Sequence, residues 1–213
     1  MTSKGTSPVT HDDVGDLAPD DAAVAVSGRR ALIGAGVIGA VLAITGGQRV
    51  SATAWPAVGA PTGDEAELLE FVMRLELTIR DLYDAAIDSG GLVDVAGAMR
   101  EQHEAYAQGL AAFTGLSARD RNDEVYDSLE SDFTGGDDAQ VALAAYDVES
   151  IAVATHTEII RLVERADIAR LLASIVAVEA RHCAVLADAA GLGDDLDALL
   201  DNDAEPLLPE DLS

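Results

Sequence analysis

Cysteine, aromatic residues and basic residues are all scarce in this sequence. Its one cysteine, Cys183, cannot form a disulfide within the chain, and because it belongs to no CxxC pair we expect it to pack as a small apolar side chain. Lysine and arginine number 13 against 39 aspartates and glutamates, which gives a formal net charge of −26. Such a surface repels a phosphate backbone, so the composition excludes nucleic acid as a partner.

No sequence signature for a nucleotide, flavin or haem stands out either. Hydrophobic residues make up 49% of the 213 residues, which is enough for one domain with a proper core. Alanine and leucine, which favour helices, are abundant, whereas the aromatic residues that favour strands make up only 4%. The composition therefore predicts an all-α fold.

Residues 1–54 have the pattern of a leader. A polar stretch is followed by Arg29 and Arg30 and then by an apolar run over residues 31–45, which is short for a hydrocarbon core of about 30 Å. The small residues at 52–54 offer a signal peptidase site. We expect cleavage at the end of this leader, with residues 55–63 as a linker to the domain.

The paired arginines resemble a twin-arginine signal, which implies export of the folded protein. The alternative is an uncleaved signal anchor, which would hold the protein at the membrane through residues 31–47. Both interpretations place the domain outside the cytoplasm.

Apolar residues recur at steps of three and four in four later segments, which is the spacing of a buried helix face. The predicted helices span residues 64–88, 93–114, 137–165 and 167–190, with a polar connection between the second and the third. Together they predict an antiparallel four-helix bundle over residues 64–192. The acidic tail at 193–213 is expected to be loose.

Polar side chains fall on or beside the apolar faces of these helices. In the fourth helix, Glu179 and His182 lie one turn apart among alanine, leucine and valine. A buried carboxylate must be paired, protonated or bound to a cation. The other helices offer Glu76 and Tyr83 in the first, His103 in the second, and Glu149 and His156 in the third.

One glutamate from each of two helices and an ExxH motif from each of the other two is the ligand pattern of carboxylate di-iron bundles. Over residues 64–192 the sequence resembles the ferritin-like superfamily, especially its small exported bacterial members. The resemblance implies oxygen or peroxide chemistry at iron or manganese. It implies these ligands: Glu76, His103, Glu149, Glu179 and His182. Tyr83 and His156 would be redox partners or hydrogen-bond partners of the ligands, and a metal ion and a second copy of the chain are the expected partners.

The second helix departs from the pattern, because Arg100 stands where the glutamate of its ExxH is due. A guanidinium turned inward would pair with the buried glutamates and take the volume of a second ion. Two interpretations stay open. The cluster is a centre for one or two ions, or it is a polar network without metal inside a non-catalytic envelope scaffold or binding protein.

Overall fold

A computed structural model of the chain describes residues 60–212, and these residues form helices and no strands. The predicted leader and most of the predicted linker lie outside the described residues. The helices are α1 (Asp64–Ser89), α2 (Val93–Thr114), α3 (Asp123–Thr134), α4 (Asp138–Leu162), α5 (Ala166–Ala189), α6 (Leu196–Leu200) and the 3-10 helix η1 (Pro209–Leu212). The all-α prediction is confirmed. Within residues 60–212, no helix has both the length and the apolar character needed to cross a membrane.

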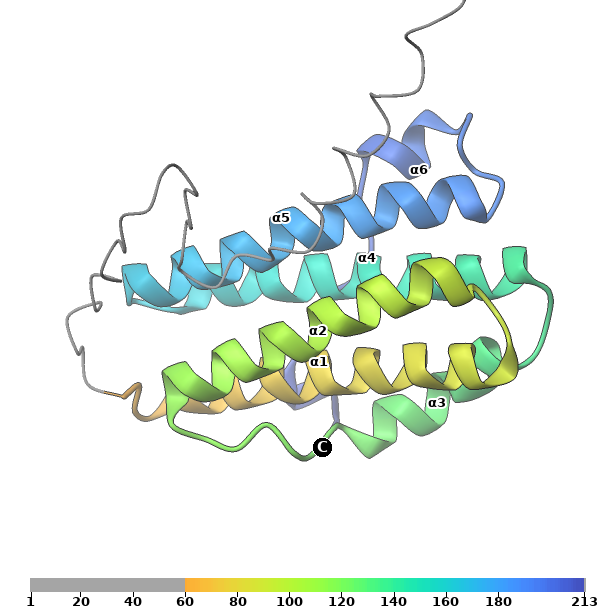
Figure 1. The fold of residues 1–213 in the computed structure, drawn as a ribbon. Helices are drawn as coiled ribbons and strands as arrows, with labels where there is room; N and C mark the ends of the chain where they lie inside the picture. The colour runs from red at the N-terminus through yellow and green to blue at the C-terminus, as the bar shows by residue number, and fades with distance from the viewer. Residues whose placement is uncertain (1–59, 213) are drawn as a thin grey trace, which may run out of the picture. The chain divides into compact units, whose positions relative to one another are not determined.

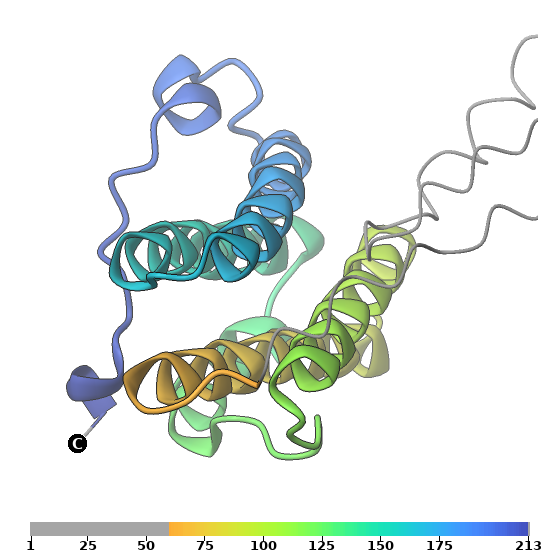
Figure 2. The ribbon, with the colours of Figure 1, turned by 90° about the vertical axis from the view of Figure 1, so that its left-hand side faces the viewer.

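The four long helices form two antiparallel hairpins that face each other (Figures 1 and 2). α1 and α2 make one hairpin, and the turn between them starts at Gly90, whose φ of 89° suits glycine. α4 and α5 make the other, and α4 begins with a capping box between Asp137 and Gln140. The carboxylate of Glu65 in α1 accepts hydrogen bonds from the backbone N–H groups of Glu164 and Arg165, so it ties the turn of the second hairpin to the first.

The link between the hairpins contains a helix that the sequence interpretation missed. α3 begins at an Asn122 cap whose side chain accepts from the backbone N–H of Val125, and it buries Tyr126 and Phe133 against the bundle. Its other residues are mostly Asp, Glu and Ser, and for this reason the sequence predicts only a polar connection here. Its few apolar residues nevertheless repeat at helical spacing.

The expectation of a loose acidic tail is wrong. After α6, the chain runs back along α4 and is held there by side-chain to backbone hydrogen bonds. Asn202 donates to the carbonyl of Ser150, and the backbone N–H of Leu207 donates to the hydroxyl of Thr155, both at 2.9 Å. Leu207 also packs against the core, so the tail is anchored by apolar contact as well.

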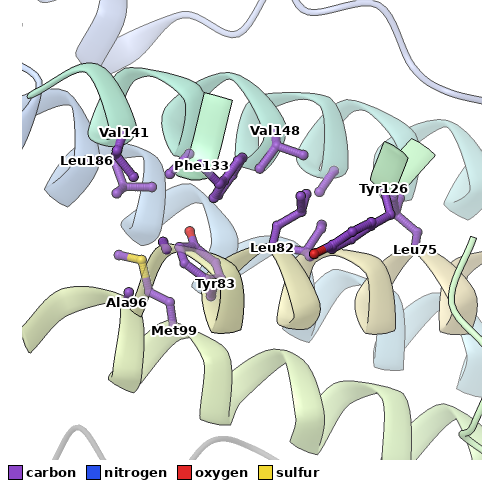
Figure 3. Packing of buried hydrophobic residues seen from close by; sticks show 14 residues of the cluster. Leu75, Leu82, Tyr83, Ala96, Met99, Tyr126, Phe133, Val141, Val148 and Leu186 are labelled. Atoms are coloured by element: carbon purple, nitrogen blue, oxygen red, sulfur yellow. The ribbon is translucent and has the colours of Figure 1, made fainter. Parts of the chain in front are cut away.

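The buried apolar residues form two clusters, one toward each end of the bundle. The first gathers side chains of α1, α2, α3 and α4 around Tyr83 and Phe133, with Leu186 from α5 (Figure 3). The second lies around Leu69, Leu110 and Leu172. Between these two clusters the inward side chains are polar, and they form the candidate site.

Candidate metal centre

Six fully or almost fully buried polar side chains from four helices meet between the two apolar clusters. We call them the Glu/His cluster: Glu76, His103, Glu149, His156, Glu179 and His182. Five of them are 0% exposed, and His182 is 5% exposed. Each hairpin supplies part of the set, so the cluster forms only where the hairpins face each other.

At one end of the cluster, three side chains converge on a single oxygen of Glu149. Its Oε1 lies 2.6 Å from the Tyr83 hydroxyl, 2.9 Å from His103 Nε2 and 3.0 Å from His182 Nδ1. The other oxygen, Oε2, is buried without a hydrogen-bond partner.

At the other end, Glu76 and Glu179 lie on either side of His156. His156 Nδ1 is 2.8 Å from Glu179 Oε2, whereas His156 Nε2 is 3.2 Å from Glu76 Oε1 and makes no hydrogen bond with it. His103 joins the two ends, because its Nδ1 is 2.7 Å from Glu76 Oε2. The unpartnered atoms at this end are Glu76 Oε1, His156 Nε2 and Glu179 Oε1.

The electrostatics of the metal-free cluster favour imidazolium ions beside carboxylates. Burial would raise the pKa of Glu149 and of Glu76, but their histidine partners reverse this and hold both pKa values below the usual range. Burial would lower the pKa of His103 and His156, but the glutamates raise the first well above normal and the second to about 10. For Glu179 burial prevails, and its pKa is raised.

Further side chains orient the histidines. Gln102 Oε1 lies 2.8 Å from His182 Nε2, the ring nitrogen that faces away from Glu149. The ring of Tyr83 stacks on His103 with centroids 5.7 Å apart, and the edge of Tyr106 packs against the same imidazole. The Tyr106 hydroxyl is buried and has no partner.

Residues 64–192 match the family described as the ferritin-like domain. The chain belongs to this ferritin-like family. Comparison with curated proteins and with solved structures gave no match. The family supports the expected bundle, but the roles of individual residues in this ferritin-like domain must come from its own geometry.

A metal ion fits the donor set that the ferritin-like domain presents. Ligand atoms of His103, Glu149 and His182 lie within 4.8 Å of one another, and so do those of Glu76, His103 and Glu179. Carboxylate oxygens and imidazole nitrogens suit iron and manganese. Buried polar atoms without partners are rare in proteins and call for an explanation, and an ion among them supplies one.

The structure brings the five predicted ligands together in one buried cluster, and Tyr83 joins them as a hydrogen-bond partner of Glu149. His156, expected beside the ligands, lies inside the cluster, because the carboxylates of α1 and α5 reach it from both sides. The sequence interpretation did not single out Gln102 or Tyr106 as site residues. Tyr106 lay on the inward face of its helix, whereas Gln102 gave no signal.

The prediction that Arg100 reaches into the site is wrong. Its Nε donates to Asp84 at 2.9 Å, and the two side chains are 36% and 46% exposed. A long side chain at the edge of a buried face turns its charge to water because desolvation is costly. Cys183 has no part in the site, and burial raises the pKa of its thiol to about 12.

Proposed function

We propose that this ferritin-like domain binds iron or manganese at the Glu/His cluster and reacts there with oxygen or peroxide. The observation that carries the proposal is the set of buried atoms without a hydrogen-bond partner on Glu76, Glu149, His156 and Glu179. A bound iron or manganese ion would supply redox chemistry that no side chain of the cluster supplies alone.

The side chains around the cluster prepare it for an ion. With an ion bound, the Nδ1–H of His103 would donate to Glu76, and its Nε2 would bind the ion beside Glu149. The Nε2–H of His182 would donate to Gln102, and its Nδ1 would bind the ion beside Glu149. The Tyr83 hydroxyl oxygen lies 2.6 Å from Glu149 Oε1, and burial raises the pKa of this hydroxyl well above normal, so it keeps its proton and donates a hydrogen bond.

The closed surroundings of the cluster restrict the substrate to small molecules. The one cluster side chain with any exposure is His182, and it is almost buried. Two hollows on the surface lie elsewhere, one lined by residues between Gly191 and Asp197 and one lined by Glu70, Arg74, Leu116 and their neighbours. Oxygen and hydrogen peroxide are small enough for such a site, whereas a larger organic substrate is not.

Metal analysis tests the proposal. Full-length protein loaded with ferrous iron or Mn(II) under anaerobic conditions and freed of excess metal should retain at least one ion per chain. The loaded protein should consume added peroxide, and apoprotein should not. Protein that retains no ion would contradict the proposal.

The second candidate is a non-catalytic scaffold at the cell envelope. The observation that favours it is the metal-free network itself, in which protonated His103 and His156 neutralise the glutamates and link the two hairpins. Arg100, which the sequence offered as support for this candidate, pairs with Asp84 instead. A protein that is equally stable with and without a chelator, and that holds no metal, would favour the scaffold.

We also propose that the domain acts outside the cytoplasm, as Arg29 and Arg30 before a short apolar run suggest. Replacement of both arginines by lysine should block secretion, and unchanged secretion would contradict the twin-arginine route. A homodimer stays a prediction, to be tested by the mass of the protein in solution.

A further inference from the structure

We propose that Tyr106 binds the substrate, and that its hydroxyl donates a hydrogen bond to hydrogen peroxide at the end of the cluster formed by Glu76 and Glu179. This inference rests on the proposed function. It narrows the substrate of that function from oxygen or peroxide to peroxide, and it assigns a role to a side chain that the metal centre does not use.

The position of Tyr106 carries the inference. The residue lies on α2 one turn after His103, and the edge of its ring packs against that imidazole with centroids 5.9 Å apart. Its side chain belongs to the core, with 4% of the residue exposed. The hydroxyl oxygen is buried and has no hydrogen-bond partner in the described part of the chain. Such a buried hydroxyl is rare and calls for a partner.

The surroundings of this hydroxyl place it beside the carboxylates of the cluster. Burial raises its pKa most, and the negative charges of Glu76, Glu179 and Glu149 raise the pKa further, in that order. Glu76 Oε1 and Glu179 Oε1 are also buried without partners, yet neither accepts from Tyr106. A small molecule between the hydroxyl and these carboxylates would satisfy both sides.

The two tyrosines that contact His103 differ in what their hydroxyls do. Tyr83 stacks on the imidazole, belongs to the apolar cluster at one end of the site, and donates to Glu149. Tyr106 belongs to the apolar cluster at the other end. The protein itself therefore engages the Tyr83 hydroxyl, whereas the Tyr106 hydroxyl is left for a ligand.

The chemistry of a single hydroxyl donor selects between the two small oxidants. A tyrosine hydroxyl is protonated at neutral pH and donates one hydrogen bond. Hydrogen peroxide accepts such a bond well and can donate in turn to a carboxylate, whereas dioxygen is a poor acceptor and donates nothing. A site built to hydrogen-bond its substrate discriminates against a molecule that lacks the bond. Tyr106 should therefore favour peroxide.

The competing interpretation treats Tyr106 as a packing residue whose hydroxyl holds a trapped water molecule. It predicts that removal of the hydroxyl changes neither the affinity for peroxide nor the surroundings of any ligand bound at the metal.

The first experiment compares full-length wild type, Tyr106→Phe and the control Tyr126→Phe, each loaded anaerobically with ferrous iron and freed of excess metal. Tyr126 suits the control because its hydroxyl donates to Glu130 on α3, outside the cluster. Circular dichroism and iron analysis confirm that each variant is folded and loaded. In Tyr106→Phe alone, we expect the KM for hydrogen peroxide to rise about 3–10-fold, because one hydrogen bond is lost, and the KM for dioxygen to stay unchanged.

The second experiment does not depend on turnover. Sodium azide, a small anion that accepts hydrogen bonds, is added to the oxidised, iron-loaded proteins, and the infrared band of its antisymmetric stretch is recorded in ordinary and in deuterated water. The band should shift on deuteration in wild type and in Tyr126→Phe, because the donated proton exchanges. In Tyr106→Phe this shift should disappear.

Other outcomes overturn the inference. An unchanged KM for peroxide in Tyr106→Phe, or an azide band that keeps its shift, would show that the hydroxyl does not reach the ligand. Equal rises in the KM for peroxide and for dioxygen would contradict the selectivity, and a loss of iron would show that the hydroxyl supports the metal instead. A wild type that retains no iron contradicts the proposed function, and the inference falls with it. A wild type that holds iron but consumes no peroxide contradicts the proposed reaction, and the azide band then decides whether Tyr106 contacts a ligand.

Discussion

The hydroxyl of Tyr83 lies 2.6 Å from Oε1 of Glu149, and both side chains are fully buried. The contact joins α1 to α4, and therefore one hairpin to the other. His103 and His182 contact the same oxygen, so a single carboxylate oxygen is the meeting point of all four long helices.

Tyr83→Phe should destabilise the metal-free protein by about 1.5–3 kcal/mol, because it removes a buried hydrogen bond to a charged group. Urea denaturation in the presence of a chelator measures the loss. The matched control is Tyr106→Phe, which removes a buried hydroxyl without a partner and should be neutral or slightly stabilising. Equal losses in the two variants would contradict the role of the Glu149 contact.

Gln102→Leu should weaken metal binding about 10–100-fold, because the amide orients the ring of a ligand, His182. Competition with a chelator of known affinity measures the change. Gln108→Leu is the control, since this exposed residue lies on the same helix and donates its side-chain hydrogen bond to Glu104, outside the cluster. A similar loss of affinity in both variants would mean that the effect does not come through His182.

The metal-free protein should lose stability as the pH rises from 6.5 to 10. The pKa of His156 is raised from 6.5 to about 10, so the folded state holds this proton more tightly than the unfolded state. The stabilisation is complete below pH 6.5 and disappears as the pH passes 10, a loss on the order of a few kcal/mol. The raised pKa of His103 acts in the same direction.

Metal should reverse this dependence, because ligand nitrogens must lose their protons before they bind an ion. The stabilisation by added Mn(II), measured as a rise in Tm, should therefore increase over the same pH range. A Tm that falls equally with pH in the presence and absence of metal would contradict histidine ligation.

Arg100→Ala should leave metal content unchanged and change the free energy of unfolding by less than about 1 kcal/mol, as expected for a partly exposed ion pair. Asp84→Asn removes the same ion pair by changing its acidic partner, and it should have the same small effect on metal content and on the free energy of unfolding. A large loss of stability in Arg100→Ala alone, in chelator at neutral pH, would show that the guanidinium neutralises the buried glutamates after all.

Removal of residues 201–213 should destabilise the domain and expose α4. The tail supplies a hydrogen bond to the carbonyl of Ser150 and another to the hydroxyl of Thr155. Hydrogen exchange should speed up in the middle of α4 more than in α2. Unchanged exchange in α4 would mean that the tail does not hold this helix in solution.

Much of the fold and most of the candidate site could be predicted from the sequence, because both follow from helical periodicity. The spacing of apolar residues located four helices to within a few residues at each end. It also placed Glu76, Glu149 and Glu179 on inward faces, where the structure has them fully buried. Periodicity says which way a side chain faces, and this was sufficient for these residues.

Periodicity could not say how far a side chain reaches or what it meets. Arg100 lies near the inward face of its helix, but its side chain is long enough to place the guanidinium at the surface beside Asp84. His156 follows Glu149 by two turns, so periodicity placed it beside the ligands but could not show that carboxylates of α1 and α5 reach it from both sides. α3 was missed because its apolar residues are few.

The separation of the cluster's partners along the chain bears on how an ion could enter. Each hairpin can form early from contacts that are local in sequence, whereas the cluster and its hydrogen-bond partners Tyr83 and Gln102 join residues 46, 66 and 80 positions apart. These links form only when the hairpins dock. Before docking, the ligands of each hairpin are open to solvent, so an ion can enter during assembly without a channel through the finished bundle. Metal supply at the place and time of folding would then decide which ion the protein carries.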